Sequence, residues 1–139
     1  MAIQEKATEQ KAILLANTPI TSETTTYSDI LDTAEYDAGV YFLCGTSLYD
    51  STGDATYVVQ EGAEANMSDA TTVAAANLVY GTAMVFSAVN ADSAGIRKEA
   101  AFGTKRYLRI AITTDATVTA ITPLVIAIVN PPVIPTASV

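Results

Sequence analysis

Residues 102–113 read Phe-Gly-Thr-Lys-Arg-Tyr-Leu-Arg-Ile-Ala-Ile-Thr and carry the clearest strand pattern in the chain. A turn at Gly103-Thr104 opens the stretch. The aliphatic side chains at positions 108, 110 and 112 then alternate with a second set, Tyr107, Arg109, Ala111 and Thr113. A period of two is expected where one face of a sheet packs on a core and the other faces solvent. We therefore predict a strand with its aliphatic residues inward and with Arg106 and Arg109 at the edge or outside.

Turn signals divide the rest of the chain into about seven or eight short strands, which is the spacing of a sandwich or barrel. Strands are expected near residues 27–33, 40–46, 56–61, 84–89, 96–101 and 117–129, after a threonine-rich extended entry at 20–26. Residues 70–80 fit a strand or a helix equally well. Pro123 predicts a sheet edge or a bulge within the last strand. The pattern predicts an all-β fold, a single antiparallel sandwich of jelly-roll or immunoglobulin-like type.

The two ends of the chain differ in composition from the predicted sandwich at 21–129. Residues 1–20 are rich in helix formers and stop at Asn17-Thr18-Pro19, which fits a short helix packed on the domain or an arm that orders against a neighbouring subunit. We favour the arm. Residues 130–139 contain three prolines, which lack the backbone donor that a central strand needs, so an extended tail is expected.

Composition restricts the partners of the protein. The chain has 139 residues, of which 50% are apolar and 16% are charged. Such a low charge fraction is typical of subunits that hide surface in an assembly, and equally of a compact β domain with small side chains. A net charge of −8 argues against nucleic-acid binding, which neutralises phosphates with Lys and Arg. Residues 1–16 are too polar for a signal peptide, and residues 124–129 are too short an apolar run for a membrane helix, so a soluble protein made in a host cytoplasm is expected.

The residue inventory offers little catalytic chemistry. Histidine and tryptophan are absent, which removes imidazole catalysis, imidazole metal ligands and the commonest platform for sugars. The single cysteine, Cys44, lies in an apolar run and is predicted to be a buried structural thiol. We expect no enzymatic activity, no cofactor and no metal.

Carboxylates are the remaining candidates for chemistry. Asp29 and Asp32 could flank a substrate in a glycosidase-like site, but two aspartates at a strand end are more typical of a solvated turn. Residues 50–54 resemble a calcium loop yet lack the alternating third acid and the distal Glu, so a plain turn is expected. Glu61 and Glu64 are expected to face solvent.

Five of the seven basic residues lie within 13 positions: Arg97, Lys98, Lys105, Arg106 and Arg109. On an acidic chain, this cluster predicts a contact with an acidic neighbouring subunit or capsid. The alternative is that these residues pair with Asp and Glu on adjacent strands as ordinary surface charges.

Residues 103–109, Gly-Thr-Lys-Arg-Tyr-Leu-Arg, resemble the G-x-K-R-Y-[VL]-R segment of small virion proteins of tailed bacteriophages. Further features agree in order over residues 24–133. These are Thr24-Thr25-Thr26, Tyr41-Phe42-Leu43, the strand from Tyr57 to Glu61, and Asn130-Pro131-Pro132. The resemblance implies a β-sandwich subunit of a virus particle, such as a decoration (cement) protein on the outer capsid surface. Its partners would be the major capsid protein and itself, with a trimer favoured by analogy.

Two other functions remain open at this point. The chain could be a tail or fibre component that binds a host glycan, with Tyr36, Tyr41, Tyr49 and Tyr57 lining the site. An enzyme would have only the carboxylates to rely on.

Overall fold

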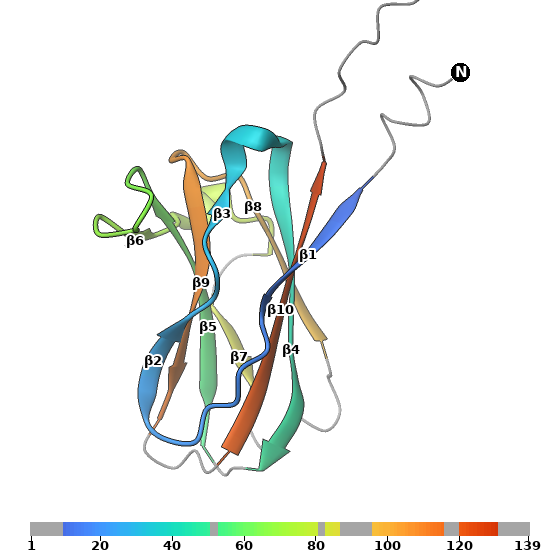
Figure 1. The fold of residues 1–139 in the computed structure, drawn as a ribbon, viewed down its shortest axis with the longest axis vertical. Coiled ribbons are helices and arrows are strands. Elements are labelled where there is room, and N and C mark those ends of the chain that lie inside the picture. The colour runs from blue at the N-terminus through green and yellow to red at the C-terminus, as the bar shows by residue number, and fades with distance from the viewer. Residues whose placement is uncertain (1–9, 51–52, 81–82, 87–95, 116–119, 131–139) are drawn as a thin grey trace, which may run out of the picture.

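Two antiparallel sheets pack face to face in a computed structural model, which describes residues 10–50, 53–80, 83–86, 96–115 and 120–130 (Figure 1). Sheet A has the order β1 (Lys11–Ala16), β10 (Ala120–Asn130), β4 (Asp37–Asp50) and β8 (Ile96–Ala101). In sheet B, β2 (Thr24–Tyr27) and β3 (Leu31–Asp32) both pair with β9 (Tyr107–Thr114), which pairs with β5 (Ala55–Gly62). The far edge of β5 pairs with β6 (Thr71–Thr72) and β7 (Met84–Phe86).

The strand order is that of a jelly roll. If β2 with β3 and β6 with β7 are each counted as one interrupted edge strand, each sheet has four positions, in the orders 1-10-4-8 and 2-9-5-6. The chain changes sheet between β1 and β2, β3 and β4, β4 and β5, and at each step from β7 to β10. Eight strands in two antiparallel sheets connected in this way form a jelly roll, whereas immunoglobulin sandwiches divide their strands differently. The predicted all-β sandwich is confirmed, with the jelly-roll alternative selected.

The core lies between the sheets and follows the alternation of side chains along each strand. On β9, Leu108, Ile110 and Ile112 are buried as predicted. Sheet A contributes Phe42 and Cys44 from β4, both fully buried. Cys44 is therefore the buried thiol that the sequence predicts. Burial is the main cause that raises the pKa of Cys44 to about 12, and the nearby charge of Glu99 adds to it.

The first edge of sheet B is interrupted at Ser28, which bonds to β9 through both backbone and side chain. The Ser28 backbone N–H donates to Ile110 O at 2.9 Å, and the Ser28 hydroxyl accepts from Ile110 N at 2.8 Å. The interruption turns Asp29 N toward sheet A, where it donates to Leu15 O at 2.8 Å. The strand predicted at 27–33 is thus two short strands, and the break between them ties sheet B to β1.

The N-terminal prediction is wrong for residues 11–16. They form β1, which pairs with β10 from Lys11 opposite Val129 to Ala16 opposite Val125. Leu15 is buried and Ile13 packs against the core, while Leu14 between them is 51% exposed. Pairing with an apolar partner strand overrides the weak helix preference of these residues. Residues 1–9 and 131–139 lie outside the described part of the chain, and with them the first nine residues of the predicted arm and nearly all of the predicted tail.

Other boundaries also differ from the predictions. Strand β4 runs to Asp50, beyond the predicted end at 46, and the turn near residue 34 is a short 3-10 helix, Thr33–Glu35. Residues 70–80 form neither a full strand nor an α-helix, since β6 is followed by a 3-10 turn at Ala75–Asn77. The predicted loop at 90–95 lies outside the described residues.

Pro123 sits at a bulge, as predicted. The register between β10 and β4 shifts between Thr122 and Pro123. β10 is flanked by β1 and β4, so the proline is not on an edge strand of the sheet. The bulge accommodates a residue that has no N–H for the ladder.

Candidate interaction surface

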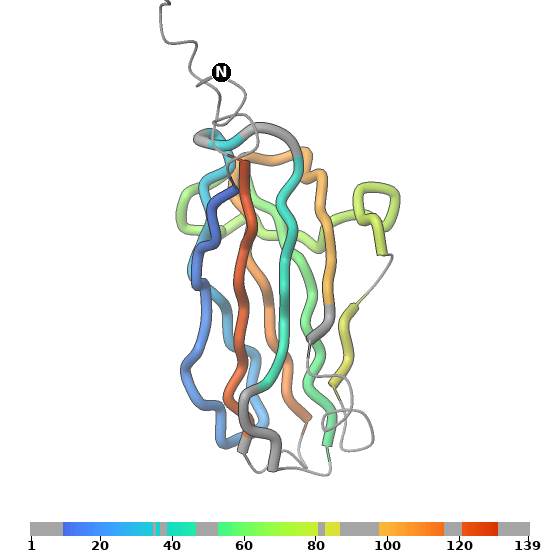
Figure 2. Tube along the Cα trace, turned by 90° about the vertical axis from the view of Figure 1, so that its right-hand side faces the viewer, coloured from blue at the N-terminus to red at the C-terminus, as the bar shows by residue number. Residues whose placement is uncertain are grey.

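The outer face of sheet A is apolar across all four strands, and Figure 2 looks onto these strands. Residues directly opposite one another in neighbouring antiparallel strands share a face of the sheet. One such row is Ala12, Ile128, Tyr41 and Ala100, and the next is Leu14, Ile126, Leu43 and Lys98. Lys98 is the charged member of these two rows. We call the seven uncharged residues together with Leu124 of β10 the apolar face.

The outer face of sheet B is more polar, although one of its rows, Tyr27, Ala111 and Val58, is apolar. Its row of Thr25, Thr113 and Thr56 ends at Val85. The Thr25 and Thr113 hydroxyls lie 3.2 Å apart and share a hydrogen bond. A threonine row with paired hydroxyls is what a solvated sheet face normally presents.

The contrast between the faces points to a covered surface on sheet A. In β10, Val125, Ala127 and Val129 are buried in the core, while Leu124, Ile126 and Ile128 on the opposite face are only half-buried. Strands that are apolar on both faces are typical of sheets covered on both sides. Contiguous exposed apolar surface on a folded domain marks an interaction site. The apolar face is therefore the candidate interaction surface.

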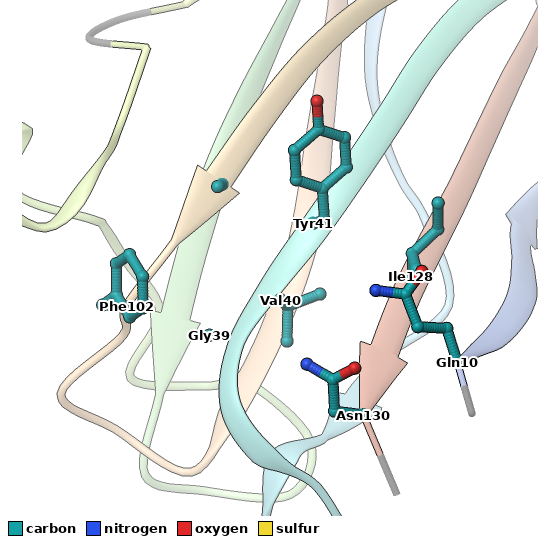
Figure 3. Close-up of a pocket in the computed structure, with 8 residues that line it drawn as sticks. Gln10, Gly39, Val40, Tyr41, Phe102, Ile128 and Asn130 are labelled. Carbon is teal, nitrogen blue, oxygen red and sulfur yellow. The ribbon is translucent and has the colours of Figure 1, made fainter. Parts of the chain in front are cut away.

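A pocket of about 370 Å³ lies at one end of this face (Figure 3). Phe102 forms one side, and Gln10, Ile128 and Asn130 form the other, with Tyr41 between them. Gly39 leaves room for the phenyl ring, because a Cβ at this position would lie 2.7 Å from Phe102 Cε1. The pocket thus combines two aromatic rings and an aliphatic side chain with two side-chain amides.

Phe102 is presented by a loop that is held on several sides. Its side chain is 54% exposed, yet its backbone N–H donates to Asn77 O at 2.8 Å. Two residues further on, Glu61 Oε2 accepts from Thr104 N at 2.6 Å and from Lys105 N at 3.2 Å. A large exposed aromatic on a preorganised loop loses little entropy when it binds, which is characteristic of an interface anchor.

The prediction that Glu61 faces solvent is wrong. Its side chain is 6% exposed, and its two oxygens accept from the Thr104 backbone and hydroxyl and from the Lys105 backbone. Glu64, by contrast, is exposed as expected. A carboxylate can be buried where several N–H groups satisfy it. Sequence offered one signal for this contact, the turn at Gly103-Thr104, whose backbone donors need an acceptor.

Tyr41 of the apolar face also contacts a further aromatic residue, Tyr80. The Tyr41 and Tyr80 rings meet edge to face at 6.3 Å, and Lys98 Nζ lies 4.7 Å from the centre of the Tyr80 ring. A side-chain hydrogen bond with Tyr80 is the main cause that raises the pKa of Tyr41. The nearby Tyr41 raises the pKa of Lys98, so the ammonium stays charged. Lys98 and the tyrosines thus form a mixed polar and aromatic rim beside the pocket.

The five clustered basic residues do not share one element. Arg97 and Lys98 lie on edge strand β8 of sheet A, and the Arg97 side chain is outside the described part of the structure. Lys105 and Arg106 lie in the loop that follows β8, and Arg109 is on the outer face of β9 in sheet B.

Besides Lys98, which contacts Tyr80, three more of these residues have partners within the chain. Lys105 Nζ lies 3.5 Å from Asp69, and Arg106 binds Asp32 through two hydrogen bonds of 2.9 and 2.7 Å. Arg109 donates to Gln60 Oε1 at 2.9 Å, and its guanidinium lies 3.7 Å from the centre of the Tyr27 ring. This geometry fits the alternative interpretation, in which the basic residues pair with neighbouring side chains as ordinary surface charges. The predicted contact with an acidic neighbouring subunit stays a proposal.

The other candidate residues are also separated. Asp32 caps the short helix at Thr33–Glu35, and the Arg106 hydrogen bonds are the main cause that lowers its pKa. Tyr57 is fully buried against Phe86, so it cannot line a glycan site, and Tyr36 packs against the core. The Tyr49 side chain lies outside the described residues.

The described residues form neither a metal site nor a membrane-spanning helix. They contain no group of three or more His, Cys, Asp or Glu side chains placed to hold a metal ion, although residues 51–52 of the predicted turn fall outside this part. Within the same ranges, no helix has the length and apolar character needed to cross a membrane.

Comparison with known proteins identifies a related fold. No protein-family model and no curated protein matches the sequence. The crystal structure of PBSX exported protein XepA superposes with a TM-score of 0.59 at 15% sequence identity. The match covers 93% of this chain and 40% of the XepA chain, so the protein spans less than half the length of that structure. At this identity the similarity establishes the fold alone.

Proposed function

We propose that this protein is a non-enzymatic structural subunit of a phage particle, and that it binds the outer surface of the capsid as a decoration (cement) protein and stabilises the shell. The observation that carries the proposal is the apolar face, since a solvated sandwich would carry polar side chains there, as the threonine row of sheet B does. Covering this face with the major capsid protein or a second copy would remove apolar surface from water in the assembly.

Fold and charge support the same proposal. Jelly rolls build many viral capsid domains and lectins, and the related fold is found in a phage protein, PBSX exported protein XepA. This support is an analogy, because one fold hosts many functions. The net charge of −8 suits an outer surface better than a DNA-lined interior. Self-association, with a trimer by analogy, would fit a symmetric lattice.

The second candidate is a tail or fibre component that binds a host glycan. The observation that favours it is the group formed by exposed Tyr80, half-buried Tyr41 and exposed Phe102, in which Tyr41 contacts Tyr80 and lines the pocket with Phe102. Aromatic rings are the usual platform for sugars. Of the four tyrosines that the sequence suggested, this group keeps Tyr41.

Gradient fractionation of the native source, with mass spectrometry across the fractions, separates the candidates. A copy number comparable to that of the main shell protein is expected for a decoration subunit. A few copies per particle would favour a tail or fibre component. Absence from particles would exclude both.

A further inference from the structure

The pocket at Phe102 has the chemistry that binds a proline-rich peptide. Its walls are the Tyr41 and Phe102 rings and the aliphatic side chain of Ile128, and its rim carries the amides of Gln10 and Asn130. Polyproline segments have no internal hydrogen bonds, so their carbonyls remain free to accept. They dock into aromatic-lined grooves, where rings pack on the prolines and side-chain donors bind the carbonyls.

The chain itself supplies such a segment directly after the pocket. Residues 131–135 read Pro-Pro-Val-Ile-Pro, in which residues 132–135 have the P-x-x-P spacing of polyproline ligands. The segment follows Asn130, the last residue of β10 and part of the pocket rim. Every copy of the protein therefore carries both the pocket and a matching ligand.

We infer that residues 131–135 of one copy bind the Tyr41–Phe102 pocket of a second copy. Pro131 restricts Asn130 to an extended conformation, and Pro132 does the same to Pro131. Extended backbone at these two residues favours delivery of the segment to a neighbouring copy over a return to the pocket that Asn130 borders. Self-binding would need a reversal after these residues, whereas a neighbouring copy receives the segment without one. Exchange around a closed ring of copies, such as the proposed trimer, gives a symmetric assembly.

This inference rests on the self-association in the proposed function and does not depend on the capsid. It names the contact that each copy makes. This contact covers the end of the apolar face at Tyr41 and Ile128 and leaves the row that begins at Leu14 for a larger partner. If the tails are not exchanged between copies, the copy number on particles can still support or exclude the proposed function.

The test uses two variants of the full chain. Pro132→Ala/Pro135→Ala alters the tail and leaves the pocket intact, whereas Phe102→Ala alters the pocket and leaves the tail intact. Phe102 is more than half exposed, so its replacement leaves the core unchanged. Melting curves of both variants should match that of the parent protein.

The decisive measurement is complementation by NMR. The tail variant is labelled with ¹⁵N and titrated with unlabelled Phe102→Ala protein, whose tail is intact. Amide shifts at Tyr41, Ala100 and Ile128 that grow with concentration are expected. They should be at least tenfold weaker when the added protein also carries the tail substitutions. Two outcomes overturn the inference: an unchanged labelled spectrum, or tail-dependent pocket shifts in the parent protein that do not vary with concentration, which would indicate self-binding.

Discussion

The buried carboxylate of Glu61 fixes the backbone of Thr104 from 43 residues away in the sequence. Glu61 Oε2 accepts from Thr104 N at 2.6 Å, and Oε1 accepts from the Thr104 hydroxyl at 3.2 Å. The contact ties β5 to the loop between β8 and β9, which carries Phe102 beside the pocket. A single carboxylate in sheet B thus holds the edge of the candidate interaction surface on sheet A.

Replacing Glu61 should therefore affect both stability and the pocket. Glu61→Ala leaves the N–H groups of Thr104 and Lys105 without their acceptor, and hydrogen bonds to a charged group contribute about 1.5–3 kcal/mol. We expect a loss of about 2–3 kcal/mol in the free energy of unfolding, measured by urea denaturation. The exposed Glu64→Ala is the matched control and should change little. Equal effects at both positions would contradict the role of Glu61.

The core strands could be predicted from the sequence because their pattern is local. Leu108, Ile110 and Ile112 repeat every second residue, and this period decides both the strand and its inward face. β1 could not be predicted, because its helix formers outweigh a period-two pattern that consists only of Ile13 and Leu15. The strand forms because it pairs with the apolar strand β10.

The candidate surface could not be predicted because it is assembled from four strands far apart in sequence. The row Leu14, Ile126 and Leu43 exists only once the register is known. Burial of Glu61 likewise depends on a loop more than 40 residues away. The basic cluster shows the reverse case, in which Lys98 and Arg109 are close in sequence but lie on different sheets.

Gly39→Ala should destabilise the fold through a steric clash. The added Cβ would lie 2.7 Å from Phe102 Cε1 and 2.8 Å from the carbonyl oxygen of Ala101. The ring can move aside, but the backbone oxygen cannot move without disturbing β8. Overpacking of this kind costs about 1–3 kcal/mol. The double variant Gly39→Ala/Phe102→Ala should recover only part of the lost stability, measured by thermal unfolding. Full recovery would mean that the added Cβ clashes with the ring alone.

Cys44 should make the protein less stable at alkaline pH. The native pKa of about 12 lies above the ordinary thiol value, so the folded state retains a proton that the unfolded state releases. The contribution of the thiol to stability is complete below about pH 8.5 and is lost as the pH rises toward 12. Urea unfolding between pH 8 and 11 should show this slope, and Cys44→Ala should reduce it. The native thiol should also resist alkylation at pH 8, since rapid labelling would indicate an accessible thiolate.

Deletions at the N-terminus should separate strand β1 from the residues before it. Removing residues 1–9 leaves the pairing of β1 with β10 in place, so the melting temperature should stay close to that of the parent protein. Removing residues 1–16 also removes buried Leu15 and exposes the edge of β10. Loss of a buried leucine alone costs about 2–5 kcal/mol, so this deletion should lower the melting temperature strongly. A large effect of the shorter deletion would mean that residues 1–9 also pack on the fold.

Substitution on the apolar face tests whether that face is an interface. Leu14 on β1 is 51% exposed, and Val85 on β7 is 39% exposed on the outer face of sheet B. Threonine suits a strand, so Leu14→Thr and Val85→Thr should each change stability by less than about 1 kcal/mol. If sheet A is covered in the assembly, Leu14→Thr should weaken binding to particles or to a second copy, while Val85→Thr should not. Co-sedimentation of the purified variants with particles that lack the protein measures this difference.

An additional Ile126→Thr substitution opposite Leu14 should deepen the defect, because the two side chains share one row of the same face. Equal binding of all variants would exclude the apolar face as the docking surface. Docking would then have to use the edges or loops of the sandwich.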